Sequence, residues 1–324
     1  MSDRYARQMM LPEVGAAGQE RLAAASVLVV GAGGLGCPVL AYLAAAGVGR
    51  LTLLDHDRVE ESNLHRQPLY RHGDVGQPKA QAARSALLAM NPGVRIDALS
   101  ERLTARNAAA LSAQADVIVD AADSFAVTYV LSDVCQLAAK PLVSASALGL
   151  SGYAGAFCGG GPSYRAVFPE LPPAAGSCAE SGVLGTLVGM LGTLEAQLSL
   201  SLLLSLQPTV LGRLISFDAR TLRFGGFSFA AAREPSGVPL AFIAPSEVAG
   251  SDVVIDLRGS SEAPLSPFPT ALRLSVEAIE SGAQQFAPEP RIVLCCRTGI
   301  RAWRAARALE ARGHRRLALI AFGA

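Results

Sequence analysis

The sequence predicts an α/β protein built on a doubly wound, mostly parallel sheet, followed by a second, small α/β domain. Three observations lead to this fold class. A buried strand, a glycine turn and a helix start follow one another over Val27–Gly36. Short apolar runs alternate with helical stretches through the first two-thirds of the chain. The composition then shifts after Phe229, before a new series of strands and helices begins.

Alternating strands and helices define the first domain, for which we expect residues 1–229. Its expected strands are Val27–Val30, Leu51–Leu54, Arg95–Leu99, Val117–Asp120 and Pro141–Ser144. Its expected helices include Pro38–Ala46, Pro78–Met90 and Ala126–Ala139. Because helices separate the strands, the strands are expected to run parallel. Later strands, for which antiparallel pairing is open, are Gly152–Cys158, Leu214–Asp218 and Leu222–Phe224.

A linker and a second domain follow. Residues 230–250 contain three prolines and two glycines, a composition typical of a linker. The second domain is expected over residues 251–324. Its expected strands are Val253–Asp256, Ile292–Cys295 and Leu317–Ala321, with a helix over Arg301–Gly313.

The bulk composition excludes several classes of protein. The net charge is +1 and 17% of residues are charged, so no nucleic-acid partner is expected. Residues Met1–Tyr5 contain no apolar signal segment, which predicts a cytoplasmic protein. The six cysteines form no C-x-x-C pair, and disulfides are not expected in the cytosol.

One apolar stretch, Val183–Leu206, is long enough to suggest a membrane span. It contains Glu195, Gln197 and several serines, and it lacks flanking Lys/Arg clusters and aromatic belts. We therefore predict a buried core helix here and no membrane association.

The glycines Gly31, Gly33 and Gly36 fit the G-x-G-x-x-G nucleotide fingerprint of a Rossmann-like sheet. The first glycine permits a tight turn, the second lets the backbone approach phosphate, and the third lets helix pack on strand. Asp55 ends the second strand, where an acidic residue can bond a ribose hydroxyl. Alone, this pattern is most typical of an NAD-dependent dehydrogenase.

The residues after Asp55 favour nucleotidyl transfer over hydride transfer. The segments Asp57–Gln67 and Gly73–Lys79 contain Arg66 and Lys79. Cations of this kind neutralise a triphosphate as pyrophosphate leaves, whereas a dehydrogenase does not need them. Arginine can clamp phosphate through two bonds, and lysine acts as a point charge.

At this point the chain resembles the MoeB/ThiF/HesA family, relatives of the ubiquitin-activating enzymes, over roughly residues 4–228. The motifs that carry the resemblance are Arg4–Gln8, Gly31–Gly36, Leu53–Asp57, Ser62–Gln67 and Val75–Lys79. The resemblance implies adenylation, with ATP and Mg²⁺, of a small ubiquitin-like sulfur-carrier protein that ends in Gly-Gly. The carrier carboxylate would attack the α-phosphorus and release pyrophosphate.

The resemblance also implies roles for individual residues. The nucleotide-binding set is Gly31, Gly33, Gly34, Gly36, Asp55, Ser62, Asn63, Leu64, His65, Arg66, Lys79 and Asp123. Within it, Asn63, Arg66 and Lys79 would bind the phosphates, and Asp123 would lie near Mg²⁺ and the reacting carboxylate. Arg7 matches an arginine supplied by the other subunit of a homodimer.

The chain departs from the family pattern at three places. Ser124 stands where the family usually has asparagine, so an amide contact is lost. Many members bind structural zinc through two C-x-x-C pairs, but Ser163–Ala166 and Arg233–Val238 replace them here, so we predict no zinc. Cys178 matches a cysteine that in some members joins the sulfur or carrier chemistry, and a structural role is equally open.

The second chemical motif is the cysteine loop, Leu294–Ala302, in which a strand runs into a short loop and a helix. Backbone N–H groups of such a loop form an anion nest and stabilise a thiolate, aided by Arg297 and Arg301. The loop resembles that of the rhodanese sulfurtransferases, with Cys296 as the nucleophile. Val253–Arg258 resembles the first rhodanese strand, whereas Gly259–Pro290 departs from the usual histidine-containing segment.

Two other interpretations of this loop remain open. Cys295 and Arg301 have the spacing of a cysteine phosphatase, although Leu294 stands where that class has histidine. In the other interpretation, the second domain is an inactive rhodanese-like fold that serves for docking.

The two motifs together predict a sulfur-carrier activating enzyme with its own sulfurtransferase. A Cys296 persulfide, loaded by a donor such as a cysteine desulfurase, would attack the adenylate, and Cys178 is a candidate for releasing a carrier thiocarboxylate. The alternatives are adenylation of a small-molecule or tRNA-bound carboxylate, and a non-catalytic partner subunit. The sequence names neither the carrier nor the final sulfur-containing product.

Overall fold

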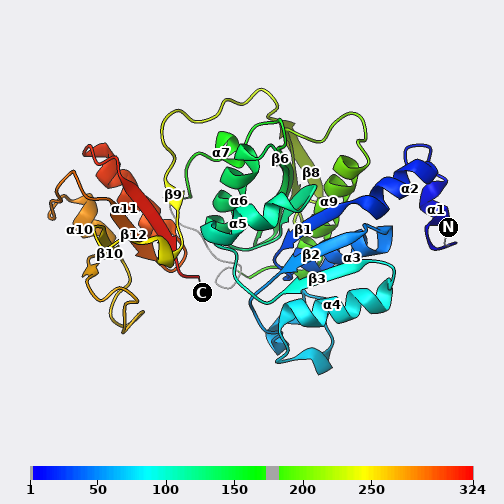
Figure 1. Cartoon of the computed structure of the whole chain (residues 1–324), viewed down its shortest axis with the longest axis horizontal. Coiled ribbons are helices and arrows are strands. Elements are labelled where there is room, and N and C mark those ends of the chain that lie inside the picture. The colour runs from blue at the N-terminus through cyan, green and yellow to red at the C-terminus, as the bar shows by residue number, and fades with distance from the viewer. Residues whose placement is uncertain (1–2, 173–181, 324) are drawn as a thin grey trace.

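The computed structural model describes residues 3–172 and 182–323, which form two α/β units (Figure 1). The chain begins with η1 (Asp3–Tyr5), α1 (Ala6–Met9) and α2 (Gly15–Ala24), which lead into the sheet of the larger unit. The smaller unit lies at the other end of the molecule, and the C-terminus lies between the two (Figure 1).

The larger unit contains an eight-stranded sheet in the order β3-β2-β1-β4-β5-β6-β7-β8. The strands are β1 Ser26–Val30, β2 Arg50–Leu54, β3 Arg95–Leu99, β4 Val117–Asp120, β5 Pro141–Leu148, β6 Ser151–Cys158, β7 Arg213–Asp218 and β8 Arg223–Ser228. The first five run parallel, and β6, β7 and β8 are antiparallel. The predicted doubly wound, mostly parallel sheet is therefore confirmed.

Helices cover both faces of this sheet. The helices are α3 Gly36–Ala46, α4 Lys79–Met90, α5 Ala105–Ala113, α6 Phe125–Leu137, α7 Tyr164–Val167 and α9 Gly185–Leu203. Alternate residues of β1 point to opposite faces: Val27 and Val29 pack in the core with α3, α4 and α9, whereas Leu28 and Val30 pack with α5 and α6. The central strands β1 and β4 are thus buried on both sides, as a parallel sheet requires, whereas the edge strand β8 is exposed.

The apolar helix α9 is long and apolar enough to cross a membrane by length and composition alone. In the structure it packs against α3 and against β5 and β6. Its buried face includes Leu187, Leu191 and Glu195. These contacts support the predicted core helix.

The smaller unit contains a five-stranded parallel sheet in the order β11-β10-β12-β13-β9. Its elements are β9 Ala241–Phe242, η4 Pro245–Glu247, β10 Val253–Asp256, β11 Leu272–Arg273, α10 Val276–Glu280, β12 Ile292–Cys296, α11 Ile300–Ala311 and β13 Leu317–Ala321. β9 lies inside the predicted linker 230–250, so the sheet begins earlier than expected. Two residues are too few to show a strand period, and Phe242 is held there by burial.

The two units share one buried core. The Tyr129 ring of α6 lies 5.3 Å from the Trp303 ring of α11 and 6.4 Å from the Phe242 ring of β9. The Trp303 Nε1–H donates to Glu170 at 2.9 Å, and Arg307 also pairs with Glu170. Aromatic burial and ion pairs therefore fix the smaller unit against α6 and α7.

Candidate active site

The glycine loop joins β1 to α3, and its backbone can be formed only by glycine at two positions. Gly31 has a φ of +98°, and a Cβ there would lie 2.6 Å from the Ala121 carbonyl oxygen. A Cβ on Gly36 would collide with the Gly31 carbonyl. At Gly33, by contrast, a Cβ would meet only the Gln67 amide nitrogen, at 3.7 Å. The loop thus presents open backbone at the start of an eleven-residue helix, a favourable place for phosphate.

Asp55 ties this loop to the end of β2. Its Oδ2 accepts a 2.7 Å hydrogen bond from the Ala32 N–H, and its Oδ1 accepts one of 2.8 Å from the Asp57 N–H. The side chain is buried, and each carboxylate oxygen keeps a lone pair beyond these bonds. Asp55 can therefore hold the loop and still accept a ribose hydroxyl.

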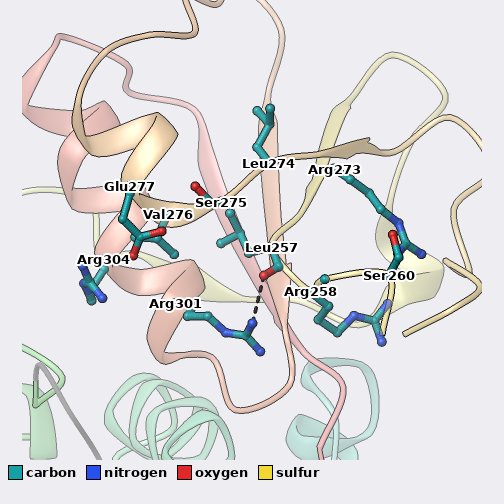
Figure 2. A pocket seen from close by; sticks show the side chains of 11 residues that line it. Leu257, Arg258, Ser260, Arg273, Leu274, Ser275, Val276, Glu277, Arg301 and Arg304 are labelled. Atoms are coloured by element: carbon teal, nitrogen blue, oxygen red, sulfur yellow. Dashed lines mark hydrogen bonds between the residues drawn. The ribbon is translucent and has the colours of Figure 1, made fainter. Parts of the chain in front are cut away.

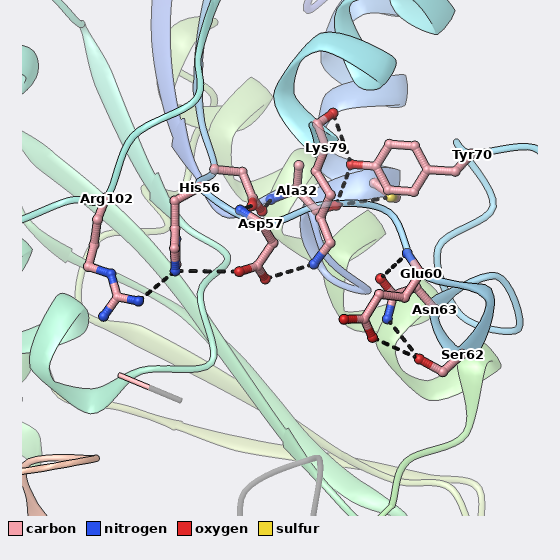
Figure 3. A network of polar contacts seen from close by, with 11 residues as sticks. Ala32, His56, Asp57, Glu60, Ser62, Asn63, Tyr70, Lys79 and Arg102 are labelled. Atoms are coloured by element: carbon pink, nitrogen blue, oxygen red, sulfur yellow. Dashed lines mark hydrogen bonds and ion pairs between the residues drawn. The ribbon is translucent and has the colours of Figure 1, made fainter. Parts of the chain in front are cut away.

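Lys79 begins α4 and is buried, yet its Nζ reaches Asp57 Oδ2 at 2.9 Å (Figure 3). Burial opposes the ionisation of Asp57, but the hydrogen bond and charge of Lys79 outweigh it and lower the Asp57 pKa. The Tyr70 hydroxyl lies 2.8 Å from the Ala32 carbonyl oxygen and 3.4 Å from that of Lys79, and so joins the start of α4 to the glycine loop. A buried ammonium with one carboxylate partner is a suitable phosphate ligand.

Arg66 and its neighbours lie in a turn after η2 (Glu61–Asn63). Asn63 is buried, and its Oδ1 accepts from the Glu60 N–H at 3.1 Å. Arg66 Nη1 donates to the Ser62 carbonyl at 3.1 Å and lies 2.8 Å from His65 Nε2. Leu64 packs against the core of the larger unit. The turn therefore anchors the partly buried Arg66 beside the nucleotide loop.

Two glycines bring α9 onto this turn. A Cβ on Gly34 would lie 2.9 Å from Val188, and one on Gly185 would lie 2.5 Å from the His65 carbonyl oxygen. Nearby, the buried Gln67 Oε1 accepts no hydrogen bond from the described residues. A buried acceptor in this state has room for one further hydrogen bond, from water or from a ligand donor. The sequence analysis did not single out Gln67, although it lies in the quoted motif.

The end of β4 carries two aspartates in contrasting surroundings. Asp120 is fully buried, accepts a 2.9 Å hydrogen bond from the Ser144 hydroxyl, and has its pKa raised by burial to about 6. Asp123 is exposed in the loop before α6, and Ser124, which begins that helix, makes no side-chain capping bond. Asp123 is therefore the more accessible of these two carboxylates for a cation.

Arg7 lies away from this group in its own chain. The neighbouring Gln8 donates to the Ala46 carbonyl at 2.9 Å, at the far end of α3 from the glycine loop. A helix of 11 residues is roughly 16 Å long, so Arg7 does not reach the loop. The other predicted residue, Cys178, lies outside the described residues.

The two segments predicted to replace the zinc-binding pairs meet in space. The Ser163 N–H and hydroxyl donate to the two carboxylate oxygens of Glu234 at 2.7 and 2.6 Å. Arg165 forms a bidentate pair with Asp133 and donates to the Leu240 carbonyl. A hydroxyl and a carboxylate do not form the thiolate-rich set that structural zinc prefers.

The cysteine loop follows β12. The Gly299 and Ala302 N–H groups donate to Cys296 Sγ at 3.1 and 3.4 Å, as an anion nest requires. Cys296 is fully buried. Arg301 does not bond to the sulfur but pairs with Glu262 and donates to the Leu257 carbonyl at 2.9 Å.

Cys295 points away from the nest, and its surroundings do not stabilise a thiolate. Its thiol lies 3.4 Å from the Ile255 carbonyl, and burial raises its pKa to about 12. A phosphatase needs a thiolate at this position, so the structure does not support that interpretation.

A cavity of about 410 Å³ lies beside this loop. Figure 2 shows the side chains that line it. It is lined by four arginines, Arg258, Arg273, Arg301 and Arg304. Three of them are paired with the carboxylates of Asp256, Glu262 and Glu280. Most of the positive charge is thus already neutralised.

These features define a class: an α/β protein with a Rossmann-like sheet, a glycine loop and the cations Arg66 and Lys79 near the carboxyl ends of its parallel strands. The chain belongs to the ThiF family, whose sequence profile matches residues 5–237. A sulfur carrier protein adenylyltransferase of Thermus thermophilus is 48% identical over 68% of this chain and 85% of its own length. The Bos taurus adenylyltransferase and sulfurtransferase MOCS3 is 51% identical over 67% of this chain.

Coverage and fold differ among the relatives. The match spans only 48% of the Bos taurus protein. The MOCS3 of Drosophila ananassae is 38% identical over 87% of this chain and 63% of its own length. The crystal structure of E. coli MccB with ATP shares the fold, with a TM-score of 0.62 and 21% identity over 70% of this chain and 72% of that one. These comparisons support an enzyme of the adenylyltransferase class.

Proposed function

We propose that the chain adenylates the C-terminal Gly-Gly carboxylate of a ubiquitin-like sulfur-carrier protein. The observation that carries this proposal is the buried Lys79, which lies with Asp57 beside the open glycine loop. The names of the relatives from Thermus thermophilus and Bos taurus support the choice of substrate.

The residues fit ATP. The glycine loop leaves space for phosphates, and Asp55 can accept a hydrogen bond from a ribose hydroxyl. Gln67 Oε1 is a buried acceptor that accepts no hydrogen bond from the described residues. The carrier carboxylate would attack the α-phosphorus, and the bond from that phosphorus to the bridging oxygen would break. Lys79 and Arg66 would stabilise the charge that develops on the leaving pyrophosphate. Asp123 would hold Mg²⁺, which supplies further neutralisation of the phosphates.

Arg7 supports a homodimer in this proposal. It is exposed and lies about one helix length from the glycine loop of its own chain. It would therefore act in the site of a second copy.

A second step would transfer sulfur. A Cys296 persulfide, loaded by a donor such as a cysteine desulfurase, would attack the acyl-adenylate carbonyl and displace AMP. A second thiol, for which Cys178 is the candidate, would then attack the Cys296 sulfur of the acyl disulfide, forming a protein disulfide and releasing the carrier thiocarboxylate. The two amides at Cys296 Sγ support an anionic sulfur here.

The length of one match also supports this second step. The Drosophila ananassae relative, an adenylyltransferase and sulfurtransferase by name, matches 87% of the chain. Residues 1–237 are only 73% of the 324 residues (237/324), so that match extends into the smaller unit.

The alternative is adenylation of another carboxylate with the smaller unit acting only in docking. The full burial of Cys296 favours this alternative, because a sulfur nucleophile must reach its substrate. A Cys296→Ser variant separates the two, with Cys295→Ser as the matched control. Loss of thiocarboxylate in the first variant alone supports sulfur transfer, and an unchanged yield supports docking.

Adenylation itself is tested by ATP–pyrophosphate exchange with Gly-Gly-ending carriers. Exchange should require a carrier and fall at least about a hundredfold in Arg66→Ala, since such a cation contributes several kcal/mol in the transition state. The control is Arg106→Ala on the exposed surface of α5. Absence of exchange with every carrier would contradict the proposal.

A further inference from the structure

Arg102, in the loop between β3 and α5, connects the nucleotide site to the smaller unit. Its Nη1 donates to the Phe322 carbonyl, and its Nη2 lies 2.8 Å from His56 Nε2. His56 Nε2 in turn lies 3.4 Å from Asp57 Oδ1, and Asp57 holds Lys79 (Figure 3). Three side chains, Asp57, His56 and Arg102, thus link Lys79 to the backbone after β13.

The same backbone lies along the cysteine loop. The Phe322 N–H donates to the Cys296 carbonyl at 3.0 Å, and the Gly323 N–H donates to the Arg297 carbonyl at 2.8 Å. The Arg258 guanidinium lies 4.0 Å from the centre of the Phe322 ring. A Cβ on Gly323 would collide with the Arg102 guanidinium, so the two segments are in direct contact. This segment therefore helps to enclose the buried Cys296.

We propose that Arg102 couples the occupancy of the nucleotide site to the exposure of Cys296, an inference that rests on the proposed binding of ATP. In the nucleotide-free chain, Arg102 holds Phe322 and Gly323 against the cysteine loop. With nucleotide bound, Arg102 leaves the Phe322 carbonyl and the loop opens.

The charges give this coupling its direction. Asp57 is stabilised by Lys79, His56 and Arg102 together. When Lys79 turns to a phosphate, Asp57 loses its closest cation, and the remaining guanidinium is drawn towards it. The planar guanidinium moves as one rigid group, so a shift towards Asp57 draws its Nη1 away from the Phe322 carbonyl. The enzyme would thereby expose its sulfur only when an adenylate can form.

The test measures alkylation of Cys296 by iodoacetamide, quantified by peptide mass spectrometry, in the full-length chain. The probe is the α,β-methylene analogue of ATP with Mg²⁺, and its binding is measured by calorimetry in the same samples. The analogue should accelerate Cys296 alkylation about tenfold, the effect of losing one hydrogen bond to a charged group. Cys295, buried in β12, should stay unmodified.

Variants distinguish the contact of Arg102 with Phe322 from the contacts through His56 that connect Arg102 to Asp57. Arg102→Ala should expose Cys296 without nucleotide, and Arg102→Lys should restore part of the protection. His56→Ala should leave Cys296 protected and remove its response to the analogue. Arg106→Ala should behave as the native chain, and circular dichroism checks that each variant is folded.

Analogue binding without a change at Cys296, or a protected Cys296 in folded Arg102→Ala, would overturn the coupling and leave adenylation standing. Absence of analogue binding would overturn the proposed function and the coupling with it.

Discussion

Glu195 of α9 should make the stability of this protein fall as pH rises. Its side chain is fully buried, and neither carboxylate oxygen has a hydrogen-bond partner among the described residues. Burial, together with the nearby Asp120, raises the pKa of Glu195 well above its usual range. The folded protein therefore holds this proton at a pH where the unfolded chain releases it.

The sign and size follow from proton linkage. A group whose folded pKa is raised stabilises the fold below its unfolded pKa, about 4.3 for glutamate. That contribution is lost at about 1.4 kcal/mol per pH unit until the pH reaches the folded pKa. Glu195→Gln removes the titration and can keep the neutral amide in the same volume, so the variant should gain relative stability with each pH unit.

Urea unfolding followed by circular dichroism at pH 5, 6, 7 and 8 measures this difference. The control is Glu13→Gln, an exposed glutamate of the N-terminal region. Its stability curve should run parallel to that of the native chain. If the Glu195→Gln curve is parallel too, the buried carboxyl does not titrate as argued and the reasoning fails.

Three further changes test the glycine loop, the serine–glutamate contact and the unit interface. Gly36→Ala should cost about 1–3 kcal/mol of stability and abolish nucleotide binding, measured by calorimetry, whereas Gly73→Ala, with open space around it, should do neither. Glu234→Gln should lower stability by about 1–3 kcal/mol in a melt, because two hydrogen bonds to Ser163 weaken, and EDTA should leave the native melting curve unchanged. Trp303→Phe should cost about 1–3 kcal/mol in urea unfolding by leaving Glu170 without its indole donor, and an unchanged midpoint would show that this contact is dispensable.

The sheet and the nucleotide loop could be predicted because their signals are local. The central strands β1 and β4 are almost entirely apolar runs, since a parallel sheet buries both faces. Gly31 is required by its positive φ and by the nearby Ala121 carbonyl, which follows the neighbouring strand β4. Gly36 is required because a Cβ there would collide with the Gly31 carbonyl, five residues earlier. Asp55 likewise follows directly from its place at a strand end.

The contacts missed by sequence analysis join distant segments. Arg102 meets Phe322 across 220 positions, and Ser163 meets Glu234 across 71. No spacing rule connects Arg102 with the backbone of Phe322. Ser163 and Glu234 lie in the two segments that replace the zinc-binding pairs, but nothing in the sequence predicts a direct hydrogen bond between them. Glu195 argued against a membrane span in this apolar helix. Nothing in the sequence showed, however, that its carboxyl would lie buried without a hydrogen-bond partner among the described residues.

The interface between the units constrains how Cys296 can become exposed. Tyr129, Phe242 and Trp303 form a continuous aromatic contact, and Arg165 lies 4.6 Å from the Tyr129 ring centre while it binds Asp133. Separating the units would expose these rings, at a cost of about 1.5–3 kcal/mol for each, and would break the Arg307–Glu170 ion pair and the hydrogen bond from Arg165 to the Leu240 carbonyl. Releasing Phe322 and Gly323 breaks far fewer contacts. Opening at the C-terminal segment is therefore the less costly route, and Arg102 is the side chain that holds this segment from the larger unit.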